Sequence, residues 1–259
     1  MNTRQLTIFI LLLGTLAMTI FFIPFTNDSD HSSPEPPPDD DDGDSSEIMW
    51  GVDSANYTDN DLYTCVKENF GEPEVWGRYL GDKEDVSMGL DEDEVKLLHD
   101  QDIHILIIYN HFTDAEGYDR GVEEAEEAIQ YAKDLEVPAN VAIFGDIEPD
   151  YAVDADFIKG WYETIADSDY EPAVYGVFDE DSALKDAFEA TDDDIQKNMV
   201  VWTAYPQEDM TTKDDAPKFN GEGPNDARLY GWQYAIEAES CNIDTNLFKE
   251  DMIDYLWKP

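Results

Sequence analysis

Apolar positions in the chain alternate between short continuous runs and runs with helical spacing. IHILIIYN (103–110) is typical of a strand whose two faces are both covered. In residues 118–138, by contrast, Val122, Ala125 and Ile129 recur at helical spacing. The same reading predicts strands at 49–55, 74–81, 103–110, 141–149, 170–178, 198–206, 227–235 and 241–248. It predicts helices at 59–70, 90–102, 118–138, 154–167, 179–190 and 250–257.

Strands that alternate with helices predict a parallel sheet. Eight strands in about 210 residues favour a closed (β/α)8 TIM-type barrel over an open sheet. Residues 207–226 are polar and rich in Gly and Pro, with no clear helix, so we expect irregularity in the last third. No Gly-x-Gly-x-x-Gly or P-loop stretch follows the first strand, which argues against a nucleotide-binding fold.

An uncharged apolar segment of 20 residues, 6–25, precedes the predicted barrel. This length matches a helix that crosses a bilayer. Arg4 comes before the segment and the first acids follow it, which predicts a cytoplasmic N-terminus and an extracellular remainder. We therefore expect residues 1–25 to form a membrane anchor. A cleaved signal peptide is the alternative, and the protein would then be secreted, but the bulky IFFIPF lacks a small-x-small cleavage site.

Residues 26–47 form a tract of Pro, Ser and Asp with nine acids. Because such a tract buries too little apolar surface to offset chain entropy, we expect a disordered acidic linker. The barrel domain then spans residues 48–259.

The composition is extremely acidic. The 259 residues include 62 Asp plus Glu against 15 Lys plus Arg, which gives a net charge of −47. Nucleic acid should repel such a chain, so it is excluded as a partner. An aromatic content of 12% argues for a folded domain rather than wholesale disorder. Adaptation to high salt, where charges are screened, and an ordinary acidic surface both remain open.

The chain has two cysteines, Cys65 and Cys241. An even pair outside the membrane suggests a disulfide, with two free buried thiols as the alternative.

Four acids lie at the ends of predicted strands, where TIM-type barrels carry their active sites. They are Asp53, Asp146, Glu148 and Asp244. Residues i and i+2 of a strand point to the same side, so Asp146 and Glu148 should both face the barrel mouth. In a chain this acidic the Asp-x-Glu pattern alone means little, and a solvated loop is the alternative. The pair is a candidate for the active site because it lies at the end of an apolar strand.

Glycoside hydrolysis uses two such carboxyl groups, one protonated as an acid and one ionised. Crowding of carboxylates raises one pKa and so helps to keep an acid protonated. Sugar faces also bind to aromatic rings. The candidate substrate-binding aromatic residues near strand ends are Tyr79, Tyr109, Tyr175, Trp202, Tyr205, Trp232 and Tyr234. Some of these should instead pack the barrel.

Other chemistries lack their signatures. The four histidines have no metal-ligand spacing, and no Gly-x-Ser-x-Gly elbow is present. We therefore expect no metal and no cofactor.

The ordered motifs GVDSA, DIE, AVYG, VWTAYP, GWQYA and NIDTN resemble those of the glycoside hydrolase family 25 lysozymes. RYLGD and the stretch GLDEDEVKLLHDQDIHILIIY are more similar to a related glycoside hydrolase-like family of the same barrel type, a domain-of-unknown-function family. The resemblance spans roughly residues 49–249. It departs after the first motif, where DSANYTDN replaces the Ser and Gln-Gly usual in the lysozymes.

The resemblance implies cleavage of the β-1,4 bond between N-acetylmuramic acid and N-acetylglucosamine in peptidoglycan. It implies Glu148 as general acid and Asp146 as its partner, with Asp53 and Asp244 completing an acidic floor. Many glycoside hydrolase-like members lose the Glu of this motif, whereas this chain keeps it. We expect a monomeric muramidase-like enzyme. The alternatives are a non-catalytic wall-binding or polysaccharide-binding module and a glycosidase for a neutral polysaccharide.

Overall fold

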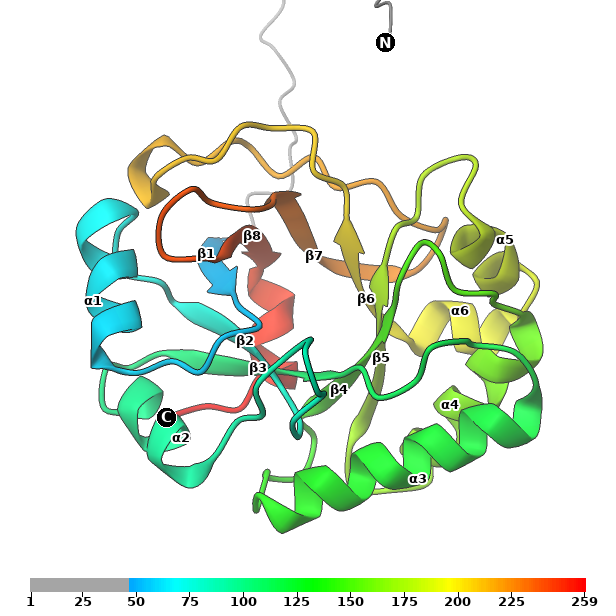
Figure 1. Ribbon diagram of the computed structural model, residues 1–259. Coiled ribbons are helices and arrows are strands. Elements are labelled where there is room, and N and C mark those ends of the chain that lie inside the picture. The colour runs from blue at the N-terminus through cyan, green and yellow to red at the C-terminus, as the bar shows by residue number, and fades with distance from the viewer. Residues whose placement is uncertain (1–46) are drawn as a thin grey trace, which may run out of the picture. The chain divides into compact units, whose positions relative to one another are not determined.

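The computed structural model describes residues 47–259, which form a closed barrel of eight strands (Figure 1). The strands follow one another around the barrel in sequence order. They are β1 (Ile48–Asp53), β2 (Val75–Tyr79), β3 (His104–Tyr109), β4 (Ala142–Ile147), β5 (Glu171–Gly176), β6 (Val200–Ala204), β7 (Arg228–Ala235) and β8 (Asp244–Lys249). The eight-stranded barrel predicted from the apolar pattern is therefore confirmed.

Six α-helices of this part of the chain lie outside the barrel and connect its first six strands. Several begin at an aspartate because its carboxylate accepts backbone N–H groups of the first turn. Asp59, Asp91 and Asp154 cap three of them in this way. The helices are α1 (Asn60–Asn69), α2 (Glu92–His99), α3 (Tyr118–Asp134), α4 (Ala155–Ala166), α5 (Ala183–Glu189) and α6 (Asp193–Asn198).

The eighth strand runs in the opposite direction from the expected one. β1 to β7 pair in parallel, but β8 is antiparallel to both β7 and β1. The (β/α)8 prediction is therefore wrong for its last unit. In the register of β1 and β8, Asp53 lies opposite Asp244 at one end of the barrel, and Ile48 lies opposite Lys249 at the other. The start of β8 thus reaches the end of the barrel where the parallel strands finish.

The last third of the domain is irregular, as expected. The segment between β6 and β7 contains a short 3-10 helix, η1 (Lys213–Asp215). The helix predicted at 250–257 is a 3-10 helix, η2 (Glu250–Tyr255). The helix predicted at 179–190 is shorter, and α6 follows it, which the apolar pattern did not predict.

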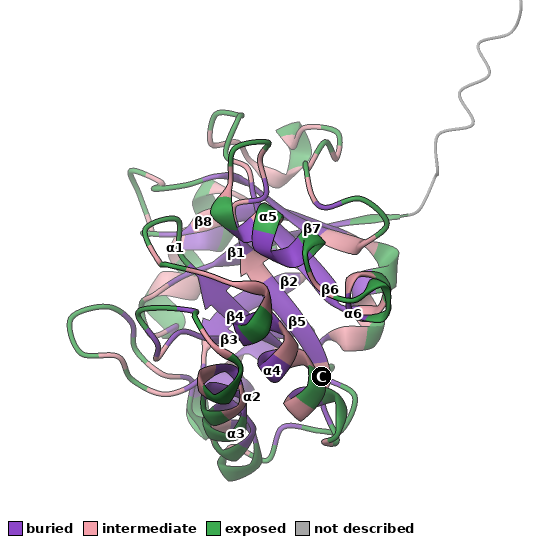
Figure 2. Ribbon diagram, turned by 90° about the vertical axis from the view of Figure 1, so that its right-hand side faces the viewer, coloured by how far each residue is buried: buried purple, intermediate pink, exposed green. Residues whose placement is uncertain are grey.

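Alternating strand residues supply two apolar layers. One fills the barrel and includes Leu106, Phe144 and Phe248, while the other separates the barrel from its helices. Figure 2 shows buried strands surrounded by helices with exposed outer faces. α3 and α4 approach closely at Gly121 and Gly160, where any Cβ would meet the facing backbone.

The predicted anchor at 1–25 and most of the predicted linker at 26–47 lie outside the described residues. Among residues 47–259, no helix is both long and apolar enough to cross a membrane.

Candidate active site at the barrel mouth

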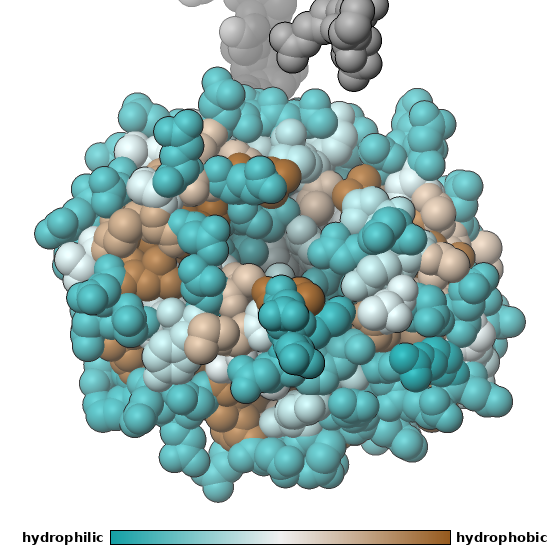
Figure 3. Space-filling model, viewed as in Figure 1, coloured by the Kyte–Doolittle hydropathy of each residue, from teal (hydrophilic) through white to brown (hydrophobic). Residues whose placement is uncertain are grey.

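The four acids predicted as site residues lie at the same end of the barrel, which we call the mouth. Asp53 ends β1, Asp146 is the second-last residue of β4, and Glu148 follows that strand directly. Asp244 is the first residue of β8 rather than a strand end, and it reaches the mouth because β8 is reversed. Most of the face seen in Figure 1 is hydrophilic, as Figure 3 shows.

Asp53 and Asp244 form one half of this site, and a single amide joins them. Gln233 Nε2 donates to Asp53 Oδ2 at 3.1 Å and to Asp244 Oδ2 at 3.2 Å. Asn246 Nδ2 also donates to Asp53 Oδ2, at 2.6 Å, and the backbone N–H of Glu237 donates to Asp244 Oδ1 at 2.7 Å. Both carboxylates are therefore held in place by N–H donors.

Two aromatic residues orient the amides. The Tyr175 hydroxyl donates to Gln233 Oε1 at 2.8 Å, and Trp202 Nε1 donates to Asn246 Oδ1 at 2.9 Å. Because these donors occupy the amide oxygens, the NH2 groups face Asp53. This network extends from the barrel interior to the mouth.

Burial dominates the electrostatics of this half. Burial, and then the charge of Asp244, raise the pKa of Asp53 to about 7, against the opposing effect of its hydrogen bonds. Burial also raises the pKa of Asp244, where the backbone N–H of Glu237 opposes the increase. Asp53 therefore titrates near neutral pH.

Asp146 and Glu148 form the other half. Asp146 is 3% exposed, and no residue of the described chain donates a hydrogen bond to its Oδ1. Burial and the nearby charge of Glu148 raise its pKa well above the usual range, while Lys83 opposes the increase. A buried carboxyl group with an unpartnered oxygen is costly when ionised, so Asp146 favours its protonated form.

Glu148 is more open to solvent than Asp146. Partial desolvation of its carboxyl group and the charge of Asp150 raise its pKa, and Lys83 again opposes the increase. Glu148 and Asp244 line the same pocket of about 370 Å³, together with Tyr175 and Gln233. A ligand in this pocket would contact groups from both halves of the site.

Two of the predicted aromatic residues lie near the acids. Tyr79 and Tyr175 project into the barrel near its mouth, where burial and the charges of the surrounding acids raise their pKa values. Both remain protonated and can donate hydrogen bonds. Tyr205 follows β6, is partly buried, and donates its hydroxyl to Glu222 at 3.1 Å.

The other four predicted aromatic residues are not available to a sugar, and this part of the prediction is wrong. The side chain of each is at most 1% exposed. Trp202 packs inside the barrel, and the other three pack in the layer between barrel and helices. The four are Tyr109, Trp202, Trp232 and Tyr234.

The sequence reading missed three polar residues of the site, Lys83, Gln233 and Asn246. Strand periodicity could have identified two of them. Asn246 lies two residues after Asp244 and so shares its face of β8. Gln233 is the polar residue in GWQYA, between two large aromatic residues that face outward. Lys83 lies in a loop, where strand periodicity gives no information.

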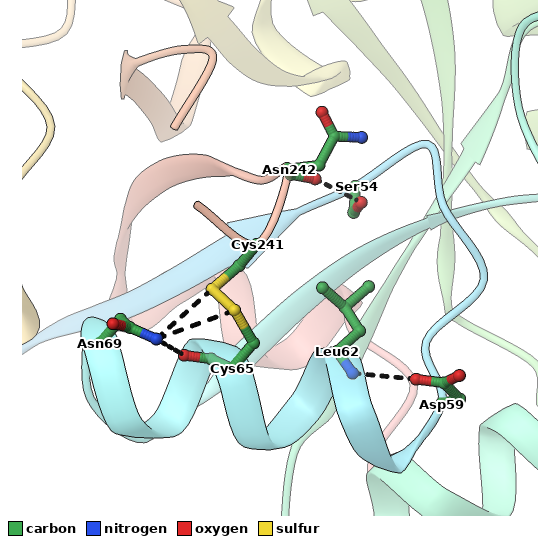
Figure 4. The surroundings of a disulfide bond; sticks show 7 residues. All are labelled: Ser54, Asp59, Leu62, Cys65, Asn69, Cys241 and Asn242. Atoms are coloured by element: carbon green, nitrogen blue, oxygen red, sulfur yellow. Dashed lines mark hydrogen bonds between the residues drawn. A yellow bond between two sulfur atoms is a disulfide. The ribbon is translucent and has the colours of Figure 1, made fainter. Parts of the chain in front are cut away.

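Cys65 of α1 and Cys241 of the β7–β8 loop form a disulfide bond (Figure 4). The same loop is joined to β1 through Ser54 Oγ, which donates to the carbonyl of Asn242 at 2.8 Å. Cys241 stands three residues before Asp244, so the disulfide fixes the segment that leads into this acid. The alternative of two free thiols is excluded.

Among residues 47–259, no group of three His, Cys, Asp or Glu side chains could hold a metal ion. The arrangement instead offers two carboxyl groups with raised pKa values in one pocket, those of Glu148 and Asp244, and two more buried at the same mouth, those of Asp53 and Asp146. Such a set can donate a proton and stabilise positive charge on a ligand.

The sequence of residues 73–248 matches the family model of the Rv2525c-like, glycoside hydrolase-like domain. The chain belongs to this family. Asp146, Glu148 and Asp244 lie inside the matched segment, whereas Asp53 precedes it. No curated protein has a sequence that matches this chain.

Solved structures agree with this family membership. A B. stearothermophilus protein is similar, with 35% identity and a TM-score of 0.76 over 81% of this chain and 100% of that one. The Tat-secreted Rv2525c of Mycobacterium tuberculosis, in complex with L-tartrate, has 13% identity and a TM-score of 0.55 over 81% and 98% of the two chains. A muramidase from Acremonium alcalophilum has 13% identity and a TM-score of 0.54 over 80% and 99%. The last two likenesses establish the glycoside hydrolase-like barrel alone.

Proposed function

We propose that this glycoside hydrolase-like protein is an extracellular glycosidase that cleaves the glycan strands of peptidoglycan. The observation that carries the proposal is the convergence of Asp53, Asp146, Glu148 and Asp244 on one mouth. Family membership and the likeness of the fold to a muramidase support the substrate class. The secretion stated for Rv2525c supports the location, with residues 6–25 as anchor or as cleaved signal.

Glu148 is the general acid of this proposal. It borders the pocket, and its raised pKa keeps a proton available for the leaving glycosidic oxygen. Asp146 lies behind it as a buried partner. Asp244, held by N–H donors of Gln233 and Glu237, supplies negative charge opposite the positive charge that develops on the sugar ring, and Asp53 adds to it in its ionised form.

Hydrolysis of purified peptidoglycan tests the proposal. The full chain in detergent should release new reducing ends, most rapidly at salt concentrations that screen the repulsion between protein and anionic wall. Glu148→Gln should abolish this release, and Glu126→Gln, which changes an exposed glutamate of α3, should retain it. Binding of peptidoglycan without turnover at every salt concentration would instead identify a non-catalytic wall-binding module.

A further inference from the structure

Lys83 lies in a hairpin that borders the mouth, in the loop between β2 and α2 (Figure 1). Its backbone pairs with Ser87, with N–H to O distances of 2.9 and 3.0 Å. The hairpin is fastened to the barrel at several points. The Met88 N–H donates to the Ala55 carbonyl at 2.9 Å, the buried Arg78 donates to the Met88 carbonyl at 2.9 Å, and Asn110 Nδ2 donates to Ser87 Oγ at 3.1 Å.

The Lys83 ammonium group contacts two neighbouring loops. Its Nζ donates to the carbonyls of Asn110 at 2.5 Å and Phe112 at 3.1 Å, which follow β3. It also lies 3.5 Å from the hydroxyl of Tyr151, beyond the end of β4. The backbone N–H of Tyr151 donates to the carbonyl of Glu148 at 3.0 Å. Lys83 therefore connects three loops of the mouth and supports the turn that carries Glu148.

Lys83 has no carboxylate partner among residues 47–259. No carboxylate there lies within 4.0 Å of it, whereas six of the eleven lysines in this range pair with one. Its three N–H groups instead have neutral acceptors. The positive charge is thus not neutralised by a contact and acts across space on the acids of the mouth.

The charged groups around the two acids show where this field acts. Asp146 faces the negative charges of Glu148 and Asp53, and Glu148 faces those of Asp150 and Asp244. The hydroxyls of Tyr79, Tyr151 and Tyr175 lie near the same acids. Lys83 is the cation that lowers the pKa of both Asp146 and Glu148.

We propose that Lys83 is a positioning residue of the acid site: it holds the turn that carries Glu148 and supplies the positive charge that balances the Asp146–Glu148 pair. Its effect on catalysis rests on the proposed glycosidase activity, whereas its effect on the two acids does not.

Carboxyl 13C chemical shifts, followed by NMR against pH in the full chain, test the charge. Asp146→Asn and Glu148→Gln assign the two signals. Lys83→Gln keeps hydrogen-bond donors but removes the charge, and should raise the pKa values of both acids by about one pH unit. Lys83→Arg should leave them close to the parent values. Lys133→Met removes the charge of an exposed lysine on α3 and should also leave them unchanged.

Two results would overturn the proposal: unchanged titration in Lys83→Gln, or an equal rise in Lys133→Met. Hydrolysis provides the second readout. The alkaline limb of the pH–rate profile, where the general acid Glu148 loses its proton, should move upward in Lys83→Gln by the same amount as the titration. If the titration shifts while the parent enzyme hydrolyses no glycan, the proposed function fails but the role of Lys83 stands.

Discussion

The two halves of the mouth hold their acids in different ways. Asp53 and Asp244 receive N–H donors from Gln233, Asn246 and the backbone of Glu237. Asp146 has an oxygen with no donor among the described residues, and its half depends on the distant charge of Lys83. The N–H donors favour the ionised carboxylates of Asp53 and Asp244 and partly offset the effect of burial on their pKa values, whereas an unpartnered oxygen at Asp146 favours the protonated acid.

The largest expected effect lies in the half without donors. Asp146→Asn should lower kcat/KM for peptidoglycan by about 10²–10⁴, as expected for loss of a group that acts with the general acid. Steady-state release of reducing ends measures it, with Glu126→Gln on the exposed face of α3 as the control. Activity within a few-fold of the parent would show that Asp146 serves packing rather than chemistry.

Removal of the disulfide should act on the other half. The double substitution Cys65→Ser and Cys241→Ser removes a disulfide bond between residues 176 positions apart in the sequence. It should lower the free energy of unfolding by about 2–4 kcal/mol. Urea unfolding measures the loss. Hydrogen exchange should rise in the β7–β8 loop, while the titration of Asp146 stays as in the parent. A change in the pKa of Asp146 would mean that the two halves of the mouth are coupled.

Asp53 gives a pH-dependent prediction. Its pKa of about 7 in the folded chain exceeds the ordinary value of 3.8, so its stabilising contribution is complete below pH 3.8 and is lost as the pH rises through 7. Asp53→Asn avoids this loss and should be more stable than the parent by about 1–3 kcal/mol at pH 8. The advantage should disappear near pH 4. Urea unfolding at both pH values checks it, and an equal difference at both would exclude titration of Asp53 as the cause.

The smallest effect is expected at Tyr175, which orients the Gln233 amide. Tyr175→Phe should reduce the free energy of unfolding by about 0.5–1.5 kcal/mol, the range for one hydrogen bond. It should also raise the pKa of Asp53, because the freed amide can turn its NH2 group away. Carboxyl NMR measures this, with Tyr118→Phe on exposed α3 as the control. An unchanged pKa of Asp53 would show that the Gln233 amide keeps its orientation without the Tyr175 hydroxyl.

Apolar periodicity located the eight strands and four acids because both depend on local sequence. The direction of β8 also had a sequence signal that the strand pattern alone did not use. The predicted strands at 227–235 and 241–248 are separated by only five residues, and a parallel crossover needs about a dozen or more. An antiparallel connection follows from that length.

Side-chain direction explains the errors among the aromatic residues. Gln233 points into the barrel, so Trp232 and Tyr234 on either side of it must point outward. Lys83 could not have been identified in this way. Its partners follow β3 and β4, and only the closed barrel brings those segments to the hairpin.

The reversal of β8 also places the end of the last strand beside the start of the first, at the base of the barrel. Because Ile48 pairs with Lys249, the polypeptide enters the barrel and leaves β8 at the end farthest from the four acids. The first strand of the barrel therefore begins at its base. The mouth with the four acids opens at the opposite end, away from the residue at which the barrel starts.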